Sequence, residues 1–458
     1  MTTLIHPRES AASMARRLDA KETTPSALLA ESLARIAASD DVLHAWAHVD
    51  PVQAGAAAAE ADARQRDGRR IGPLDGLPVG VKDNLFVAGM PARWGSRFFA
   101  DFTPPQDDIV VERLRTAGAV IVGKTSTPEF ALSGRTFSPI TGHTRHPMDP
   151  RLTPGGSSGG AVAAVSSGMI PLAVATDAGG STRLPASYTG LVGLRPSNGR
   201  VPRRYGFPPM AMDFQAIGLI AGSVEDVHML YAALTGPDPR DPTSQRLPAD
   251  IPTGPGRKFR IGWLATYGDE AVDPAVRAAV EDAAQRLARL DCHVELCAAP
   301  YDLAAIRDIW GVIPAAGVAR MASRFPDRWE AEASASLLPM AKRGQALTIP
   351  ELVDAVDRLN AFRADVSANW GGFDALLMPS AAAPAWPAED EFPREIDGKP
   401  GHARAMNIFS TWVNAVGYPG LNVPGLPHPD GRPIGVQLVG PYGAEPVLFE
   451  IARRLEAG

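Results

Sequence analysis

The sequence predicts one large α/β domain with a mixed, mostly parallel central sheet and helices on both faces. Three observations favour this class: helical periodicity up to residue 70, alternating strand-like and helical segments from residue 71, and the same alternation after residue 259. A chain of 458 residues could also form two or three domains. Because strand-like runs lie on both sides of a polar, proline-rich connector at 236–258, we expect a single domain over 1–458.

The N-terminal part, 1–70, is expected to be helical. Thr24 can cap a helix that has Pro25 in its first turn, and four apolar side chains then fall on one helical face: Leu28, Leu29, Leu33 and Ile36. An alanine-rich second helix follows and ends near Gly68.

Residues 71–235 carry the clearest alternation. Alternating apolar residues predict a strand over 77–81, with Lys82 beginning a turn. A helix capped by Asp107 or Asp108 and closed by Gly118 follows, and then come a strand at 119–123, a small-residue helix at 159–168 and a buried strand at 171–176. This β–α–β–α–β order is typical of a parallel sheet with covering helices.

The C-terminal part, 259–458, repeats the pattern. Asp273 is expected to cap a helix that ends near residue 290, and the region 301–370 is expected to be helical and amphipathic. Expected strands are 259–265, 293–297, 373–380, 419–425 and 433–440, with a closing helix over 445–458. The proline-rich stretch 380–401 is expected to be a long loop, either a surface excursion or a cover over a pocket.

Charge and hydropathy exclude several classes of protein. The net charge is −6 and no run of Lys or Arg occurs, which argues against a nucleic acid or an anionic membrane as partner. No apolar stretch approaches the ~20 residues that a membrane span needs, and the first ten residues lack the apolar core of a signal peptide. We therefore expect a cytoplasmic protein.

The cysteines and histidines give no sign of a metal site. Cys292 and Cys297 flank a strand-like segment at an odd separation, so they should point to opposite faces as two small reduced side chains. Reduced thiols fit the cytoplasm. His143 and His146 are three residues apart but have no acidic or cysteine companion nearby, so we expect no metal.

Three short segments carry the chemical signal: VKDN with Lys82, PGGSSGG with Ser157 and Ser158, and DAGGSTR with Ser181. Two glycines before Ser181 let the backbone expose several N–H groups beside a hydroxyl, as acyl transfer requires. Taken alone, GGSSGG also fits a flexible loop. The nucleophile elbow and the phosphate loop each need an apolar strand directly before the glycines, and 143–154 does not supply one.

In this order the three segments resemble the amidase signature family. Further similar blocks are GLPVGVKDN, AGAVIVGKT, PGGSSGGAVAA, PLAVATDAGGSTRLPAS and NAVGYPGLNVP. The similarity runs over roughly residues 20–455 and is densest over 71–223. Ser157 and Ser181 lie 24 residues apart, as the family pattern requires. The resemblance implies the amidase signature fold, with the helical region 301–370 lining the substrate entrance.

The resemblance also implies a Ser–cisSer–Lys triad. Ser181 is the expected nucleophile that forms an acyl-enzyme, and Ser157, preceded by a cis peptide bond, relays the proton between Ser181 and Lys82. Lys82 replaces the histidine that is missing near Ser181. It can accept a proton only when neutral, so burial must lower its pKa from about 10.4.

The resemblance also implies supporting roles for the residues that flank the triad. The oxyanion hole is expected from the N–H groups of Ala178, Gly179, Gly180 and Ser181. Ser158 is expected to orient the Lys82–Ser157 pair, and the backbone of Ser133 is expected to line the substrate-binding pocket. For Asp177 and Arg183, bracing of the loop and direct contact with substrate both stay open.

The expected function is an amidohydrolase that cleaves a small-molecule carboxamide, hydrazide or carbamoyl compound through a Ser181 acyl-enzyme. We expect no cofactor, a small-molecule substrate as the partner, and neither nucleic acid nor membrane; relatives are often dimers, so a homodimer stays open. One alternative is the glutaminase subunit of a tRNA-dependent glutamine amidotransferase, although the residues after GKT differ from its usual wording. An inactive binding or scaffold protein is disfavoured because the triad is intact.

Overall fold

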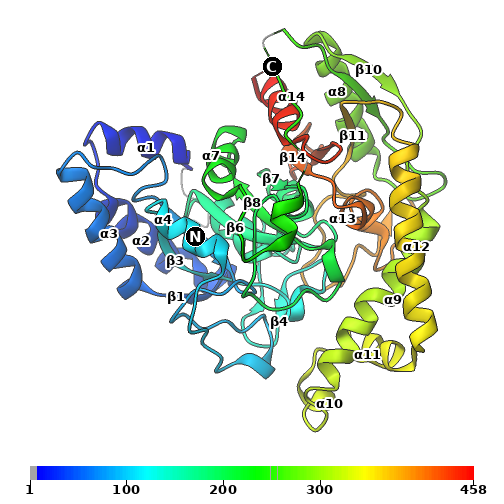
Figure 1. The fold of residues 1–458 in the computed structure, drawn as a ribbon, viewed down its shortest axis with the longest axis horizontal. Helices are drawn as coiled ribbons and strands as arrows, with labels where there is room; N and C mark the ends of the chain where they lie inside the picture. Colours follow the sequence, from blue (N-terminus) through cyan, green and yellow to red (C-terminus); the bar gives the residue numbers. More distant parts are fainter. Residues whose placement is uncertain (1–7, 248, 255, 458) are drawn as a thin grey trace.

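Within residues 8–247, 249–254 and 256–457, which the computed structural model describes, eleven strands form one continuous sheet (Figure 1). Its spatial order is β1-β3-β2-β6-β8-β7-β14-β15-β11-β9-β10. Segments from both halves of the chain therefore share the sheet, because β7 from the first half pairs with β14 from the second. This confirms the predicted α/β class with one central sheet.

The strands of this sheet are short and mostly buried. Their bounds are β1 Trp46–Val49, β2 Pro78–Lys82, β3 Val120–Thr125, β6 Leu172–Asp177, β7 Val192–Arg195, β8 Ala216–Ala221, β9 Arg260–Trp263, β10 His293–Leu296, β11 Ala375–Pro379, β14 Gly420–Pro424 and β15 Gly435–Val439. Parallel pairing joins β2 to β3 and β6, and β9 to β10 and β11. The strands between these two groups pair antiparallel, so the sheet is mixed.

Helices cover the sheet and extend beyond it. Their bounds are α1 Ala11–Asp19, α2 Pro25–Leu43, α3 Pro51–Arg66, α4 Ile109–Thr116, α5 Gly159–Ser166, α6 Arg183–Thr189, α7 Val224–Leu234, α8 Pro274–Arg289, α9 Leu303–Ala322, α10 Trp329–Glu332, α11 Leu337–Ala346, α12 Ile349–Ala368, α13 Thr411–Val416 and α14 Glu445–Ala457. Two small hairpins, β4 (Phe137–Ser138) with β5 (Gly142–His143) and β12 (Glu395–Ile396) with β13 (Lys399–Pro400), lie outside the main sheet.

The helix signals in the sequence are confirmed at several positions. The Thr24 side chain accepts a hydrogen bond from the Ala27 N–H at the start of α2, and Asp273 caps α8 in the same manner. The expected helical region 301–370 forms α9 to α12, at one side of the molecule (Figure 1). α1 lies in the N-terminal part that was expected to be helical, although no separate helix was predicted there, and β1 was not predicted.

Three local expectations need correction or stay open. Lys82 is the last residue of β2 rather than the first residue of a turn. Asp108 precedes α4 but makes no cap with its side chain, because its carboxylate accepts from the N–H groups of Arg204 and Gly206. The connector 236–258 contains a 3₁₀ turn at Pro242–Arg246, and the single domain over 1–458 that includes this connector stays a prediction.

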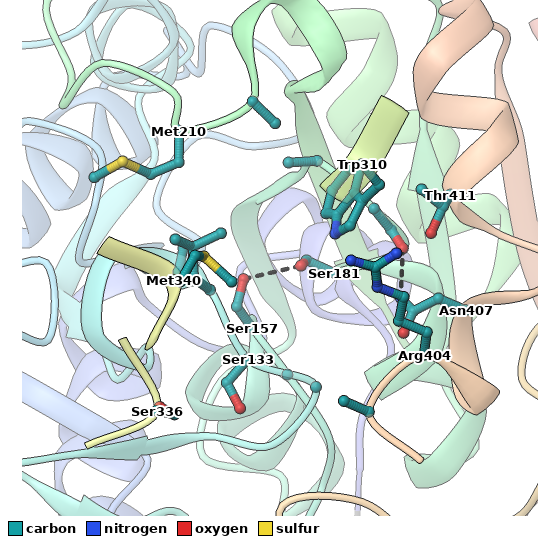
Figure 2. A pocket seen from close by; sticks show the side chains of 18 of the residues that line it. Ser133, Ser157, Ser181, Met210, Trp310, Ser336, Met340, Arg404, Asn407 and Thr411 are labelled. Atoms are coloured by element: carbon teal, nitrogen blue, oxygen red, sulfur yellow. Dashed lines mark hydrogen bonds between the residues drawn. The ribbon is translucent and has the colours of Figure 1, made fainter. Parts of the chain in front are cut away.

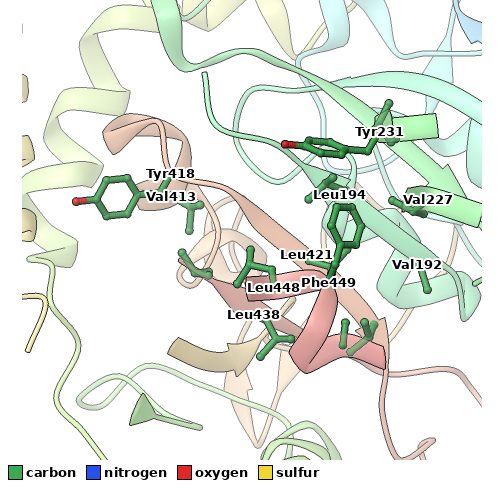
Figure 3. Close-up of a cluster of buried hydrophobic side chains, with 14 of the residues drawn as sticks. Val192, Leu194, Val227, Tyr231, Val413, Tyr418, Leu421, Leu438, Leu448 and Phe449 are labelled. Atoms are coloured by element: carbon green, nitrogen blue, oxygen red, sulfur yellow. The ribbon is translucent and has the colours of Figure 1, made fainter. Parts of the chain in front are cut away.

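Two apolar layers sandwich the sheet. Successive residues of β6 point to opposite faces: Leu172 and Val174 join the core under α7 and α14, whereas Ala173 and Ala175 join the core under α5. Figure 3 shows the first layer, where sheet and helix side chains interdigitate: Val192, Leu194, Leu421 and Leu438 from the sheet, and Val227, Tyr231, Leu448 and Phe449 from the helices. This burial fixes the strands whose ends carry the site.

Two further expectations concern the cysteines and membrane-spanning segments. Both cysteines are free thiols and flank β10, Cys292 being buried and Cys297 partly exposed. Among the residues with described positions, no helix is both long and apolar enough to span a bilayer.

Candidate active site

The three glycine- and serine-rich segments meet at one edge of the sheet. β2 ends at Lys82, and β6, its parallel neighbour, ends at Asp177, just before the loop that carries Ser181. The carboxyl ends of parallel strands lie at the same edge, so the two segments come together although about 100 residues separate them. Ser157 and Ser158 lie immediately before α5, which packs against β2 and β6.

A chain of hydrogen bonds links the three predicted catalytic side chains. Lys82 Nζ donates to Ser157 Oγ at 2.9 Å, and Ser157 Oγ donates to Ser181 Oγ at 2.9 Å. Figure 2 shows the second of these bonds at the wall of a pocket. The peptide bond between Gly156 and Ser157 is cis, which is the isomer that the resemblance implies. The geometry allows a proton to move between Ser181 and Lys82 through one hydroxyl.

Lys82 is fully buried and has no carboxylate within ion-pair distance among the described residues. Within the described part of the chain, the hydrogen-bond partners of its Nζ are hydroxyl and carbonyl oxygens: Ser157 Oγ, Ser158 Oγ at 2.9 Å and the Thr176 carbonyl at 3.3 Å. Burial lowers the pKa of Lys82 to about 7, against the weaker opposing effect of the Asp177 charge. A large share of the protein therefore holds a neutral amine near neutral pH.

Ser158 ties the amine to the strand beside it. Its Oγ accepts from Lys82 Nζ at 2.9 Å and donates to the Thr176 carbonyl at 3.3 Å. The same carbonyl accepts from Lys82, so Ser158 and the end of β6 together fix the direction of the amine. This is the position that an orienting residue would need.

Asp177 and Arg183 brace the loop between them. The Asp177 carboxylate accepts from the N–H groups of Gly180 at 2.7 Å and Thr182 at 3.1 Å, and from Arg183 Nε and Nη2, both at 3.1 Å. Burial alone would raise the pKa of Asp177, but the Arg183 guanidinium holds it below its usual range. Neither side chain lines the pocket, so the geometry supports bracing rather than contact with substrate.

The expected oxyanion donors do not all face the pocket. Ala178, Gly179 and Ser181 line it, and in the described part of the chain their N–H groups have no hydrogen-bond acceptor. The Gly180 N–H instead donates to Asp177, which removes it from the expected set. Gly180 has a φ of +111°, and a Cβ there would lie 2.1 Å from Leu184 Cδ1, so only glycine fits.

Residues from the C-terminal part hold the same loop, and the sequence did not identify them as site residues. Asn407 Nδ2 and Ser410 Oγ both donate to the Gly179 carbonyl, at 2.8 and 2.9 Å. Asn414 Nδ2 donates to the Asp177 carbonyl at 2.9 Å. Of the three, only Asn414 lies in a segment with family-like wording, NAVGYPGLNVP.

A cavity of about 430 Å³ opens beside Ser181. It is lined by the cis-bonded segment, by the 178–181 loop, by Ser133 and by α9 and α11, with Trp310 and Met340 on facing sides (Figure 2). Glu391 and Phe392 of the long 380–401 loop also line it, so that loop covers part of the pocket. The size suits a small molecule.

The described residues contain no group of three His, Cys, Asp or Glu side chains that could hold a metal ion. His146 is buried, and its Nε2 lies 2.8 Å from the Tyr188 carbonyl, whereas the ring of His143 contacts the Phe137 ring in a tilted arrangement. The two histidines therefore have separate structural surroundings.

Comparison with known proteins identifies the class of this fold and site. A model of the amidase family matches residues 27–449, so the chain belongs to the amidase signature family. Solved structures agree: the crystal structure of an amidase has a TM-score of 0.87 at 31% identity, covering 98% of this chain and 99% of that one. A bacterial aryl acylamidase of the same family has a TM-score of 0.88 at 25% identity, covering 98% and 96%.

Curated relatives point to a particular branch. The chain is 34% identical to a subunit of the glutamyl-tRNA(Gln) amidotransferase of Chloroflexus aurantiacus, covering 98% of this chain and 96% of that protein. It is 35% identical to the protein of the same name from Anaeromyxobacter dehalogenans, covering 98% and 95%.

These relatives correct two expectations from the sequence. The predicted hydrolase of a small-molecule amide, with that molecule as its partner, is wrong, because the full-length curated relatives bear the name of one subunit of a larger enzyme. The alternative stated above, one subunit of an amidotransferase, is favoured instead. The triad could not distinguish the hydrolase from the amidotransferase subunit, because both interpretations include it. The residues that follow GKT, which argued against the subunit, did not distinguish the two correctly either.

Proposed function

We propose that this chain is the glutaminase subunit of a glutamyl-tRNA(Gln) amidotransferase, cleaving the carboxamide of glutamine to supply ammonia to other subunits. The observation that carries the proposal is similarity over the whole chain to curated proteins of that name. The hydrogen-bonded Lys82–Ser157–Ser181 chain supports an active rather than an inactive protein.

In the first step Ser181 Oγ attacks the carbonyl carbon of the carboxamide. Its proton passes to Ser157 Oγ, whose own proton passes to the neutral amine of Lys82. The oxygen that becomes negative lies against the free N–H groups of Ala178, Gly179 and Ser181, and one such donor contributes roughly 3–4 kcal/mol to the transition state.

In the second step the C–N bond breaks. The ammonium of Lys82 returns the proton through Ser157 to the departing nitrogen, which leaves as ammonia, and the acyl group stays on Ser181 as an ester. A water molecule then attacks this ester and gives a proton to the same relay. Glutamate departs, and Ser181 recovers its hydroxyl proton.

The test uses the purified chain alone and the chain co-expressed with the other subunits of its amidotransferase. Ammonia release from L-glutamine and conversion of glutamyl-tRNA to glutaminyl-tRNA are measured in parallel. We expect glutamine hydrolysis that partner subunits stimulate, together with amide transfer that needs the partners. Ser181→Ala should abolish both, whereas Ser323→Ala, an exposed serine after α9, should abolish neither. Hydrolysis of other amides with no activity on glutamine in either preparation would contradict the proposal.

A further inference from the structure

Three arginines line the cavity that contains Ser181: Arg307 from α9, Arg343 from α11 and Arg404 from the segment before α13. Arg307 is neutralised by Glu270, whose carboxylate oxygens accept from its two terminal nitrogens at 2.6 and 2.8 Å. In the described part of the chain, no carboxylate lies within ion-pair distance of Arg343 or Arg404. Among the described residues that line the cavity, Arg343 and Arg404 are thus two cations without a carboxylate partner.

Arg404 is held in place without being neutralised. Its Nη1 donates to the carbonyl oxygen of Arg307 at 2.7 Å, and its side chain is half-buried. Burial lowers the pKa of Arg404, and the neighbouring cations Arg343 and Arg307 lower it further, with only Asp308 acting in the opposite direction. Figure 2 shows Arg404 beside Trp310 and Asn407, on the side of the pocket where Ser181 lies.

The other described residues that line the cavity provide no further cation for an anionic ligand. Trp310, Ile306 and Met340 present apolar surface. Glu391, the acidic side chain among the described lining residues, is exposed on the covering loop and forms no ion pair with Arg343 or Arg404. A carboxylate inside the cavity would therefore find its best partners at Arg404 and Arg343, where a guanidinium can donate two parallel hydrogen bonds.

We infer that Arg404 and Arg343 form a carboxylate-binding subsite, which selects amides that carry a carboxylate at the end remote from the scissile bond. The inference rests on the proposed function, because glutamine is such an amide, and it adds the residues that recognise its charged end. Arg404, held by the Arg307 carbonyl, sets the position of the carboxylate. Arg343 is exposed at the cavity rim and adds charge.

The experiment compares two amides of similar length, glutaric acid monoamide and pentanamide, which differ by a carboxylate. Binding to the Ser181→Ala protein is measured by calorimetry, and ammonia release by the active protein is measured as kcat/KM. Variants are Arg404→Gln, Arg343→Gln and, as the matched control, Lys342→Gln, which removes the same charge from the same turn of α11 at a residue outside the cavity.

We expect the parent protein to favour the monoamide. Arg404→Gln should reduce that preference by about tenfold or more, since a hydrogen bond to a charged group commonly has this effect. Arg343→Gln should reduce it less, Lys342→Gln should leave it unchanged, and Arg404→Lys should restore part of it. Equal binding of the two amides, or an equal loss in Lys342→Gln, would overturn the subsite.

The calorimetric arm separates this inference from the proposed function. If the monoamide binds through Arg404 but no preparation hydrolyses glutamine, the subsite stands and the glutaminase assignment fails. If glutamine is hydrolysed and all three Gln variants keep the same preference, the assignment stands and the subsite fails.

Discussion

Asn407 Nδ2 donates to the carbonyl oxygen of Gly179 at 2.8 Å, across 228 positions of sequence. Ser410 Oγ donates to the same oxygen at 2.9 Å. Because the peptide group is planar, the direction of this carbonyl also fixes the Gly180 N–H, which points to Asp177 rather than to the pocket. The segment before α13 therefore controls the geometry of the loop that presents Ser181.

Removing this contact should slow catalysis more than it weakens binding. Asn407→Ala leaves the Gly179 carbonyl with one donor, and we expect kcat to fall by roughly tenfold, the effect of about one lost hydrogen bond, with a smaller change in KM. Steady-state kinetics with glutamine measure the separate effects on kcat and KM, and Ser410→Ala should show the same pattern. A large rise in KM at constant kcat would instead identify Asn407 as a substrate contact.

The rate should depend on pH through the Lys82 amine. Burial lowers the pKa of Lys82 to about 7, so the neutral form that accepts a proton is lost below that pH and gained above it. The ratio kcat/KM should rise with pH and level off, with an inflection near the pKa of about 7. Lys82→Ala should lose most activity and this inflection, and Lys342→Gln should keep both. An inflection that survives in Lys82→Ala would point to another base.

Gly180 should tolerate no side chain. Its φ is +111°, and a Cβ would lie 2.1 Å from Leu184 Cδ1 and 2.5 Å from Ser410 Oγ. We expect Gly180→Ala to reduce the free energy of unfolding by about 1–3 kcal/mol and to lower the melting temperature in a thermal scan. Gly222→Ala is the control, since its Cβ would have nothing within 4 Å. Equal melting temperatures of the two variants would show that the loop adjusts freely.

An acyl-enzyme should divide between two nucleophiles. If Ser181 forms an ester with the acyl group, added hydroxylamine should capture it as hydroxamate while ammonia release continues. The fraction of hydroxamate should rise with hydroxylamine concentration, and Ser181→Ala should form none. Glutamate as the sole acyl product at every concentration would argue for direct attack by water.

The sequence was sufficient for the class of fold and for the local segments that meet at the site. Lys82 at a strand end and Ser157 and Ser181 in glycine-rich loops have local signals, because turns and strand ends depend on nearby residues. Their catalytic roles stay predictions, although the side chains lie in hydrogen-bond contact.

Features that depend on distant contacts could not be predicted. Asn407 and Ser410 are ordinary polar residues in a stretch without a motif, and only folding brings them to Gly179. The direction of the Gly180 N–H follows from those contacts. The sequence therefore could not show that this N–H donates to Asp177 and is not one of the oxyanion-hole donors. β1 is four residues long, and it forms a strand because it pairs antiparallel with β3, a contact between segments that are distant in the sequence. The triad did not distinguish the amide hydrolase from the amidotransferase subunit, because both interpretations include it.

The most direct test of the account is the rate at which a fluorophosphonate labels the protein as a function of pH, with the labelled residue identified by peptide mass spectrometry. The account predicts a single label on Ser181, with a rate that rises through the Lys82 pKa of about 7 and becomes slow and independent of pH in Lys82→Ala. A label on another residue, or an unchanged pH dependence in Lys82→Ala, would contradict it.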